Sequence, residues 1–228
     1  MVFVAVAFIF FLAGMEVDIF IPSYPELQQQ FNLSPAKVQL CLSVNFVTYC
    51  IASLYSGSLG DRYGLRKTIL GGLSVFIAGS IACAFASEFS SILIGRALQG
   101  LGMAAPASLG YVVIAERYSS EKQASLLGTL NGFITVAMAF APVIGSYVTI
   151  YAGWRGNFLV LLALAMVSSG FCIFLLPKDH RKSEGIYISL SSYKPLFSVE
   201  NFFKISSDYL RIYLLLLDIY WYGVNSVY

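Results

Sequence analysis

Hydrophobic residues are arranged along this chain in long runs, which short polar segments separate. Each run is about as long as the roughly 20 apolar residues that a helix needs to cross a lipid bilayer. Inside a bilayer every backbone N–H and C=O must be paired within the protein, and this favours helices. The predicted spans are Val2–Ile21, Val38–Leu59, Thr68–Ala86, Ile92–Ala115, Ala124–Ile150 and Asn157–Leu176, followed by a seventh apolar run at Tyr209–Tyr228.

The composition points the same way. Only 11% of the 228 residues are charged, whereas a soluble domain carries about 25%. The charged residues gather at the ends of the apolar runs. All four cysteines lie inside these runs and no C-x-x-C spacing occurs, so neither a disulfide framework nor a metal site is indicated. We therefore predict an all-α membrane protein that binds no metal and no cofactor.

The apolar pattern also predicts the domain organisation: a six-helix domain at 1–177, a polar linker at 178–207 and part of a seventh transmembrane helix at 208–228. The last run contains Asp218 and reaches Tyr228 with no polar flank, so we expect a chain shortened relative to a longer parent. Short cytoplasmic loops are rich in Lys and Arg. One set of connections is rich in these residues, which predicts that the N-terminus and the linker are cytoplasmic. The basic residues of this set are Arg62, Arg66, Lys67, Arg117, Lys122, Lys178, Arg181 and Lys182. The opposite set holds Lys37 and Arg155.

The strongest motif connects the second and third spans and reads Gly57-Ser58-Leu59-Gly60-Asp61-Arg62-Tyr63-Gly64-Leu65-Arg66-Lys67. Glycines supply the backbone freedom that a short reversal between two helices requires. A stop-transfer cluster of charges would explain Arg66 and Lys67, but it would explain neither Asp61 nor the three glycines.

This motif resembles the loop between helices two and three of the major facilitator superfamily. The matching residues are Gly57, Leu59, Asp61, Arg62, Gly64 and Arg66. The resemblance implies a loop that locks the cytoplasmic side of a transporter, with Glu116 at the end of the fourth span as the acidic partner of Arg66. An ordinary glutamate that extends toward the membrane surface is the alternative for Glu116.

Arg96 is the second signal, because it lies inside the apolar run Ile92–Ala115. A charged residue within a span costs about 3 kcal/mol on insertion scales and is functional by default. The alternative is an arginine that reaches the nearby outer surface. Arg96, Gln99, Gly100 and Gly102 match the fourth-helix motif of proton-coupled exporters in the same superfamily, which favours a functional role.

A buried cation needs an acid at the same depth, and the first span offers Glu16 and Asp18. Glu16 and Asp18 are two positions apart, which places them about 200° apart around a helix, so both cannot face one cavity. Asp18-Ile19-Phe20-Ile21-Pro22-Ser23-Tyr24-Pro25 resembles the signature of exporters of the bicyclomycin-resistance type. This resemblance selects Asp18 as the cavity-facing proton carrier and Arg96 as its electrostatic partner.

Small residues on the fifth span form the third signal, at Gly128, Gly132, Pro142 and Gly145. Close helix packing is their simplest meaning. They also match in part the antiporter motif of the superfamily's exporters, which favours export and implies a packing face for the second half of the transporter. Four polar residues are expected to line the substrate cavity, although hydrogen bonding between helices is an equally good use for them: Asn45, Tyr49, Gln99 and Asn131.

Together these signals resemble the N-terminal six-helix half of a drug:proton antiporter with part of helix seven, in the cytoplasmic (bacterial inner) membrane. The implied partners are the lipid bilayer, a small drug-like substrate, protons, and a missing C-terminal half or a second copy; no nucleic acid is expected. No G-x-x-x-x-G-K-[ST] loop is present to bind ATP. The alternative is a remnant that does not transport, or a membrane assembly partner. An enzyme is disfavoured, since the single histidine, His180, lies beside Lys178 and Arg181 without a catalytic arrangement.

Overall fold

The structure is a computed structural model that describes residues 1–177. The predicted linker at 178–207 and the predicted seventh helix at 208–228 lie outside the described residues. Within 1–177 the chain is helical and contains no strand, so the predicted all-α fold class is confirmed. The helices are α1 (Val2–Asp18), the short 3-10 helix η1 (Ile21–Ser23), α2 (Tyr24–Phe31), α3 (Pro35–Tyr63), α4 (Leu65–Ala84), α5 (Phe89–Arg117) and α6 (Ser120–Leu175).

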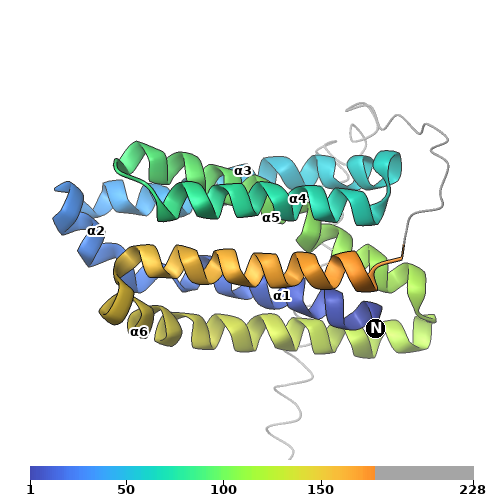
Figure 1. Ribbon diagram of the computed structural model, residues 1–228. Helices are drawn as coiled ribbons and strands as arrows, with labels where there is room; N and C mark the ends of the chain where they lie inside the picture. Colours follow the sequence, from blue (N-terminus) through green and yellow to red (C-terminus); the bar gives the residue numbers. More distant parts are fainter. Residues whose placement is uncertain (178–228) are drawn as a thin grey trace, which may run out of the picture. The chain divides into compact units, whose positions relative to one another are not determined.

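The 56-residue helix α6 consists of two antiparallel segments. At about 1.5 Å per residue a straight helix of this length would reach roughly 84 Å, whereas the hydrocarbon core of a bilayer is about 30 Å thick. The chain reverses at Gly153, whose φ of 66° and ψ of −178° are not helical. The segments 120–152 and 154–175 therefore correspond to the fifth and sixth predicted spans (Figure 1).

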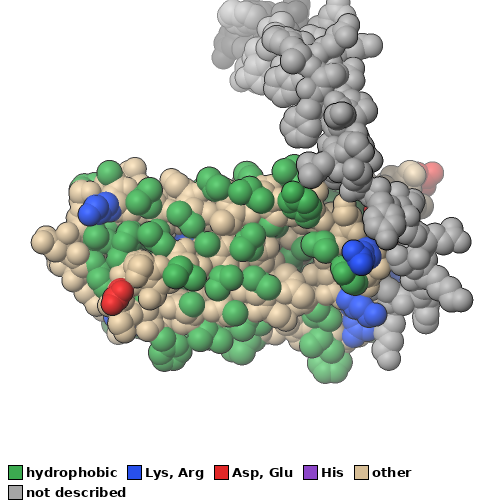
Figure 2. Space-filling model, turned by 90° about the horizontal axis from the view of Figure 1, so that it is seen from above, with side chains coloured by type: hydrophobic (Ala, Val, Ile, Leu, Met, Phe, Trp, Pro, Cys, Tyr) green, Lys and Arg blue, Asp and Glu red, His purple; other side chains and the backbone are tan. Residues whose placement is uncertain are grey.

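Connections between helices lie at two ends of the bundle (Figure 1). One end holds Met1, the turn at Gly64 and the α5–α6 connection, and we call it the Met1 end. The opposite end holds α2, the α4–α5 connection and Gly153, and we call it the α2 end. Figure 2 shows hydrophobic side chains across the middle of one face and Lys and Arg side chains toward the ends, as expected for a protein that spans a membrane.

The polar segment after the first span is helical. Helix α1 ends at Asp18, before Pro22 and Pro25. Both prolines then lie in the first turns of new short helices, η1 and α2. Proline is tolerated there because the first N–H groups of a helix have no partner within it. Helix α3 has Ser34 as N-cap and begins at Pro35, three residues before the predicted second span at Val38–Leu59.

Close packing of α4 on α5 depends on glycine. A Cβ atom on Gly79 would lie 2.7 Å from the carbonyl oxygen of Gly95, a distance that real Cβ atoms do not adopt. The two backbones therefore approach each other as in other membrane helix pairs with small residues at the contact. This approach brings Ser80 of α4 to the polar residues of α5.

Candidate functional site

Arg96 of α5 is fully buried. Its guanidinium carbon lies 5.1 Å from the ring centroid of Phe20 and 5.8 Å from that of Phe158. Aromatic faces attract a cation, and the attraction grows when water is absent. The alternative in which Arg96 extends to the surface is therefore wrong, because the side chain lies inside the bundle.

A chain of hydrogen bonds fixes one side of this guanidinium. Nη1 of Arg96 donates to Oε1 of Gln99 at 2.9 Å and to the backbone oxygen of Glu16 at 3.4 Å. Nε2 of Gln99 donates to Oγ of Ser80 at 2.9 Å, and Ser80 donates to the backbone oxygen of Phe76. Because Ser80 uses its proton on the backbone, it accepts from Gln99, and the Gln99 amide must turn its oxygen toward Arg96.

Glu16 is the acid that the structure brings to Arg96. It is buried, and Nδ2 of Asn45 donates to its Oε1 at 2.7 Å. The same Nδ2 lies 3.2 Å from the backbone oxygen of Arg96. We call Glu16, Asn45, Ser80, Arg96 and Gln99 the Arg96 cluster; it joins α1, α3, α4 and α5.

The expectation that Asp18 is the acid beside Arg96 is corrected by this geometry. Asp18 ends α1 and is half-buried, on a different side of the helix from Glu16. The 200° between the two residues is the reason, because Asp18 cannot share the side of α1 on which Glu16 contacts α3 and α5. Whether either carboxylate carries a proton stays a prediction.

The four predicted cavity residues divide into two groups. Asn45 and Gln99 belong to the buried Arg96 cluster, where they bond to other helices. Asn131 is exposed, and its Oδ1 accepts a 2.9 Å hydrogen bond from the hydroxyl of Tyr111. Tyr49 is half-buried and lies within electrostatic range of both Glu16 and Tyr111. Tyr49, Tyr111 and Asn131 thus form a polar surface next to the buried acid. Tyr111 was not predicted, because a single tyrosine inside an apolar run carries no signal in the sequence.

The glycine motif at the Met1 end has a different structure from the expected loop. Helix α3 continues through Gly57 and Gly60 to Tyr63, so Asp61 and Arg62 lie in its last turn. Only Gly64, with a φ of 92°, leaves the helical conformation. Arg62 lies over the ring of Tyr63, and a Cβ on Gly60 would press on Leu109 of α5. The reversal thus needs one glycine, and Gly60 serves helix packing.

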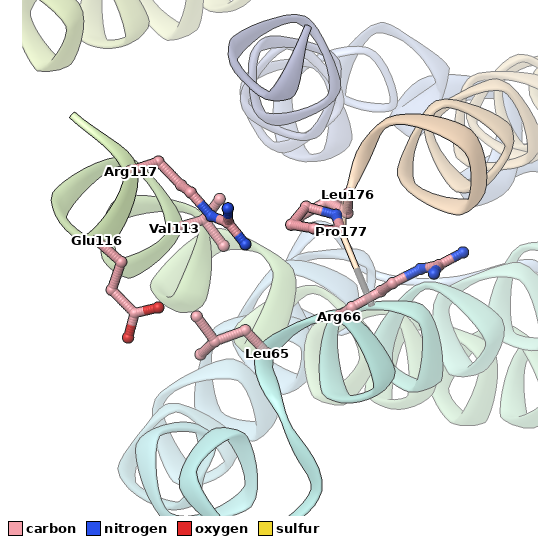
Figure 3. A pocket seen from close by; sticks show the side chains of 7 residues that line it. All are labelled: Leu65, Arg66, Val113, Glu116, Arg117, Leu176 and Pro177. Carbon is pink, nitrogen blue, oxygen red and sulfur yellow. The ribbon is translucent and has the colours of Figure 1, made fainter. Parts of the chain in front are cut away.

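A small pocket lies beside this turn (Figure 3). Arg66 donates a short hydrogen bond to the backbone oxygen of Ile173 in α6. Figure 3 shows the side chains of Arg66 and Glu116 on opposite sides of the pocket, with their charged groups directed apart. The predicted ion pair between them stays a prediction. The pocket is lined by Leu65, Arg66, Val113, Glu116, Arg117, Leu176 and Pro177.

The small residues of the first α6 segment also divide. A Cβ on Gly145 would collide with the backbone oxygen of Ile19, so Gly145 packs against the end of α1. A Cβ on Gly128 or Gly132 would meet nothing within 4 Å among the described residues. Pro142 lies within the helix and is half-buried. Gly128 and Gly132 are therefore the ones that remain available for a partner outside the described part of the chain.

Three hydrogen bonds at the α2 end were not predicted from the sequence. The backbone N–H of Trp154 donates to Oε2 of Glu26 at 2.8 Å, and its indole N–H donates to Gln30 at 2.6 Å. Arg155 donates to the backbone oxygen of Ala86 at 2.7 Å. The residues Gly153-Trp154-Arg155 could have signalled a turn, since glycine before a bulky aromatic residue in a long apolar region suggests a reversal.

The described residues hold no group of three or more His, Cys, Asp or Glu side chains suited to a metal ion. Three of the four cysteines are buried, and all four are free.

Comparison with known proteins identifies the family. The model of the Major Facilitator Superfamily matches residues 6–227. The chain belongs to this superfamily. It is therefore a multi-pass membrane protein of a transporter family and not an enzyme. Its described helices have the fold of the N-terminal half of a major facilitator protein.

Two curated relatives are informative. The chain is 26% identical over 160 residues to the multidrug resistance protein MdtL of Salmonella dublin, covering 70% of this chain and 40% of that protein. It is 30% identical over 162 residues to the uncharacterized MFS-type transporter YwoD of Bacillus subtilis, covering 70% of this chain and 35% of YwoD. The chain thus spans less than half the length of these relatives.

Two solved structures share the fold. A D-xylose-proton symporter superposes with a TM-score of 0.69 at 15% identity, covering 85% of this chain and 51% of the symporter. The xylose transporter XylE from E. coli, in a partially occluded inward-open conformation, gives a TM-score of 0.70 at 16% identity, covering 78% of this chain and 48% of XylE. At this identity the likeness concerns the fold alone.

Proposed function

We propose that this chain is the N-terminal half of a proton-coupled exporter of small amphipathic compounds, of the bicyclomycin-resistance type. The observation that carries the proposal is the buried carboxyl group of Glu16, bonded to Asn45 and next to the buried Arg96. A carboxyl group in an apolar bundle is costly unless it serves a purpose, and proton relays in transporters are built from such groups. The name of MdtL supports drugs as the substrate class.

Glu16 is proposed as the proton carrier, in place of Asp18. Arg96 stabilises the carboxylate form, and Asn45 is able to bond to either form because an amide both donates and accepts. The polar surface of Tyr49, Tyr111 and Asn131 faces the substrate. Major facilitator transporters bind substrate between their two halves, so this surface supplies one wall.

The Met1 end is proposed to be cytoplasmic, with the turn at Gly64, the end of α3 and Glu116 as the gate. Basic residues support this orientation, because they are more numerous in the connections at this end than at the α2 end. The second half of the transporter, or a second copy of this chain, is proposed to cover the open face at Gly128 and Gly132. The proposed location is the inner membrane of a bacterium.

A sugar:proton symporter is the second candidate, since one of the structural relatives carries that name. The Arg96 cluster would serve either an exporter or a symporter. The two differ in the substrate and in whether substrate and proton move in opposite directions or in the same direction. A chain that does not transport alone, and serves as an assembly partner, is the third candidate.

The test uses vesicles in which the chain is present alone or together with the C-terminal half of MdtL. We expect gradient-driven export of a fluorescent drug with both halves present. Glu16→Gln should reduce the rate at least about tenfold, and the matched variant Asp18→Asn should reduce it less. The opposite ranking would restore Asp18 as the carrier. Uptake of xylose with protons would favour the symporter, and no transport in any combination would favour the assembly partner.

A further inference from the structure

Buried polar side-chain atoms almost always have a hydrogen-bond partner, so exceptions need an explanation. Four such exceptions belong to three residues: the hydroxyl of Tyr24, Nε and Nη2 of Arg96, and Oδ1 of Asn157. Arg96 and Asn157 are fully buried. None of these atoms takes part in the hydrogen bonds of the Arg96 cluster.

The three residues lie in one packing shell. The ring of Phe20 lies 5.1 Å from the guanidinium carbon of Arg96 and 5.4 Å from the ring centroid of Tyr24. Phe158, which follows Asn157 in the chain, lies 5.8 Å from the same guanidinium carbon. Nδ2 of Asn157 donates to Oγ of Ser23 at 2.6 Å, and Ser23 precedes Tyr24. Tyr24 therefore packs on the same aromatic ring as Arg96, and Asn157 bonds to the residue that precedes Tyr24.

These atoms have complementary chemistry. Nε and Nη2 are the two donors of one edge of the guanidinium group. The Tyr24 hydroxyl donates and accepts, and Oδ1 of Asn157 accepts. A water molecule donates two hydrogen bonds and accepts two, and buried waters make about three bonds to groups of this kind. A large or apolar ligand would not satisfy them.

We propose that Tyr24, Asn157 and the Nε–Nη2 edge of Arg96 bind water molecules, and that this water carries protons between Asp18 and Glu16. The second part rests on the proposed function, in which Glu16 is the proton carrier. Asp18 is half-buried and lies within electrostatic range of Tyr24, which is also in range of Arg96. Asp18 would then be the acid that receives protons from the outer surface, and Glu16 the acid that stores them.

Each transfer leaves the water itself unchanged. A water molecule accepts one proton from the Asp18 side and releases another toward Glu16. The released proton binds to a carboxylate oxygen of Glu16. The groups that face this route come from several elements. Glu16 is in range of Arg96 on α5 and Tyr49 on α3, and Tyr24 is in range of Cys41 on α3.

The test uses the full chain in lipid nanodiscs and infrared spectroscopy after a rapid fall in pH. The carboxyl band of Glu16 is identified by its loss in Glu16→Gln. Bands of internal water are identified by their shift in water labelled with heavy oxygen. Tyr24→Phe keeps the ring against Phe20 and removes the hydroxyl. Tyr151→Phe is the matched control, because the Tyr151 side chain is exposed on α6.

We expect Tyr24→Phe to lose water bands and to slow the appearance of the Glu16 band at least tenfold, with an unchanged final amplitude. Tyr151→Phe should behave as the unaltered chain. Asn157→Leu should repeat the Tyr24→Phe result if it folds, and Tyr24→Phe is decisive if it does not. An unaltered chain without internal water bands, or a Glu16 band that appears equally fast in Tyr24→Phe, would overturn the proposal. If Glu16 never gains a proton, the proposed function and the proton route both fail, whereas a water band lost in Tyr24→Phe would still support the water site.

Discussion

The side-chain amide of Asn45 on α3 donates to the carboxylate of Glu16 on α1 at 2.7 Å and lies 3.2 Å from the backbone oxygen of Arg96 on α5. One amide group thus connects three helices at the depth of Glu16, which is the buried acid of α1. A change in the charge of Glu16 changes the hydrogen bond that holds α3 to α1. The packing of α3 is therefore linked directly to the charge of Glu16.

Removing this amide should destabilise the chain in a way that depends on Glu16. Asn45→Leu leaves the buried carboxyl group without its donor, which costs about 1–3 kcal/mol. We expect a lower melting temperature in detergent, and a smaller loss when Glu16→Gln is already present, because the two residues are coupled. Ser43→Ala, at an exposed position of the same helix, is the control and should change little. Additive effects of Asn45→Leu and Glu16→Gln would mean that the pair is not coupled.

Ser80 should matter through Gln99 although it does not touch Arg96. Ser80→Ala removes the acceptor that orients the Gln99 amide, and we expect a loss of about 1 kcal/mol in stability and weaker gradient-driven transport. Ser74→Ala is a close match, since Ser74 lies on α4 and also bonds to the carbonyl four residues earlier. If the two variants behave alike, the bond from Gln99 to Ser80 has no role in holding Arg96.

The contact at the α2 end should be measurable by itself. Glu26 accepts from the first N–H of the second α6 segment, which is the position where a negative charge stabilises a helix. We expect Glu26→Ala to cost about 1 kcal/mol and to speed proteolysis near Gly153. Gln29→Ala, at an exposed position of α2, should do neither. Equal effects of the two changes would show that Glu26 does not hold the turn.

Gly145 and Gly128 should respond differently to the same substitution. Gly145→Ala places a methyl group against the backbone of Ile19, and we expect a loss of about 1–3 kcal/mol from overpacking. Gly128→Ala meets open space within the described residues and should leave the chain as stable as before. In the presence of the C-terminal half of MdtL, Gly128→Ala should weaken association of the two chains. Thermal melting and co-purification measure the two effects.

The orientation is open to a reporter experiment. If the Met1 end is cytoplasmic, a reporter fused after Lys182 should be active only when it works inside the cell. A fusion in α2 after Gln29 should show the opposite activity, because an odd number of crossings separates the two sites. A reporter at Lys182 that is active only outside would reverse the proposed gate as well.

The helices could be predicted well because each membrane span needs an apolar run of about the same length, with few polar residues inside it. All six predicted spans have a helical counterpart, including the pair joined at Gly153. Rotation of a helix about its axis is harder to predict, and the choice between Asp18 and Glu16 depended on it. Each lies near the α2 end of α1, and only the positions of α3 and α5 decide which one is buried. The extension of α3 to Tyr63 was missed for a related reason, since Gly57 and Gly60 suggest a loop until Leu109 is seen against Gly60.

The reversal at Gly153 also bears on how the chain is made. Only one residue leaves the helical conformation there, so the two apolar segments of α6 have almost no hydrophilic loop between them. A ribosome-bound insertion machinery would thus receive them as a helical hairpin that enters the bilayer as one unit. Its tip carries Arg155, whose charge is costly to move through hydrocarbon. Burial of two apolar segments in the same step opposes that cost, whereas a single segment inserted first would have to oppose it alone.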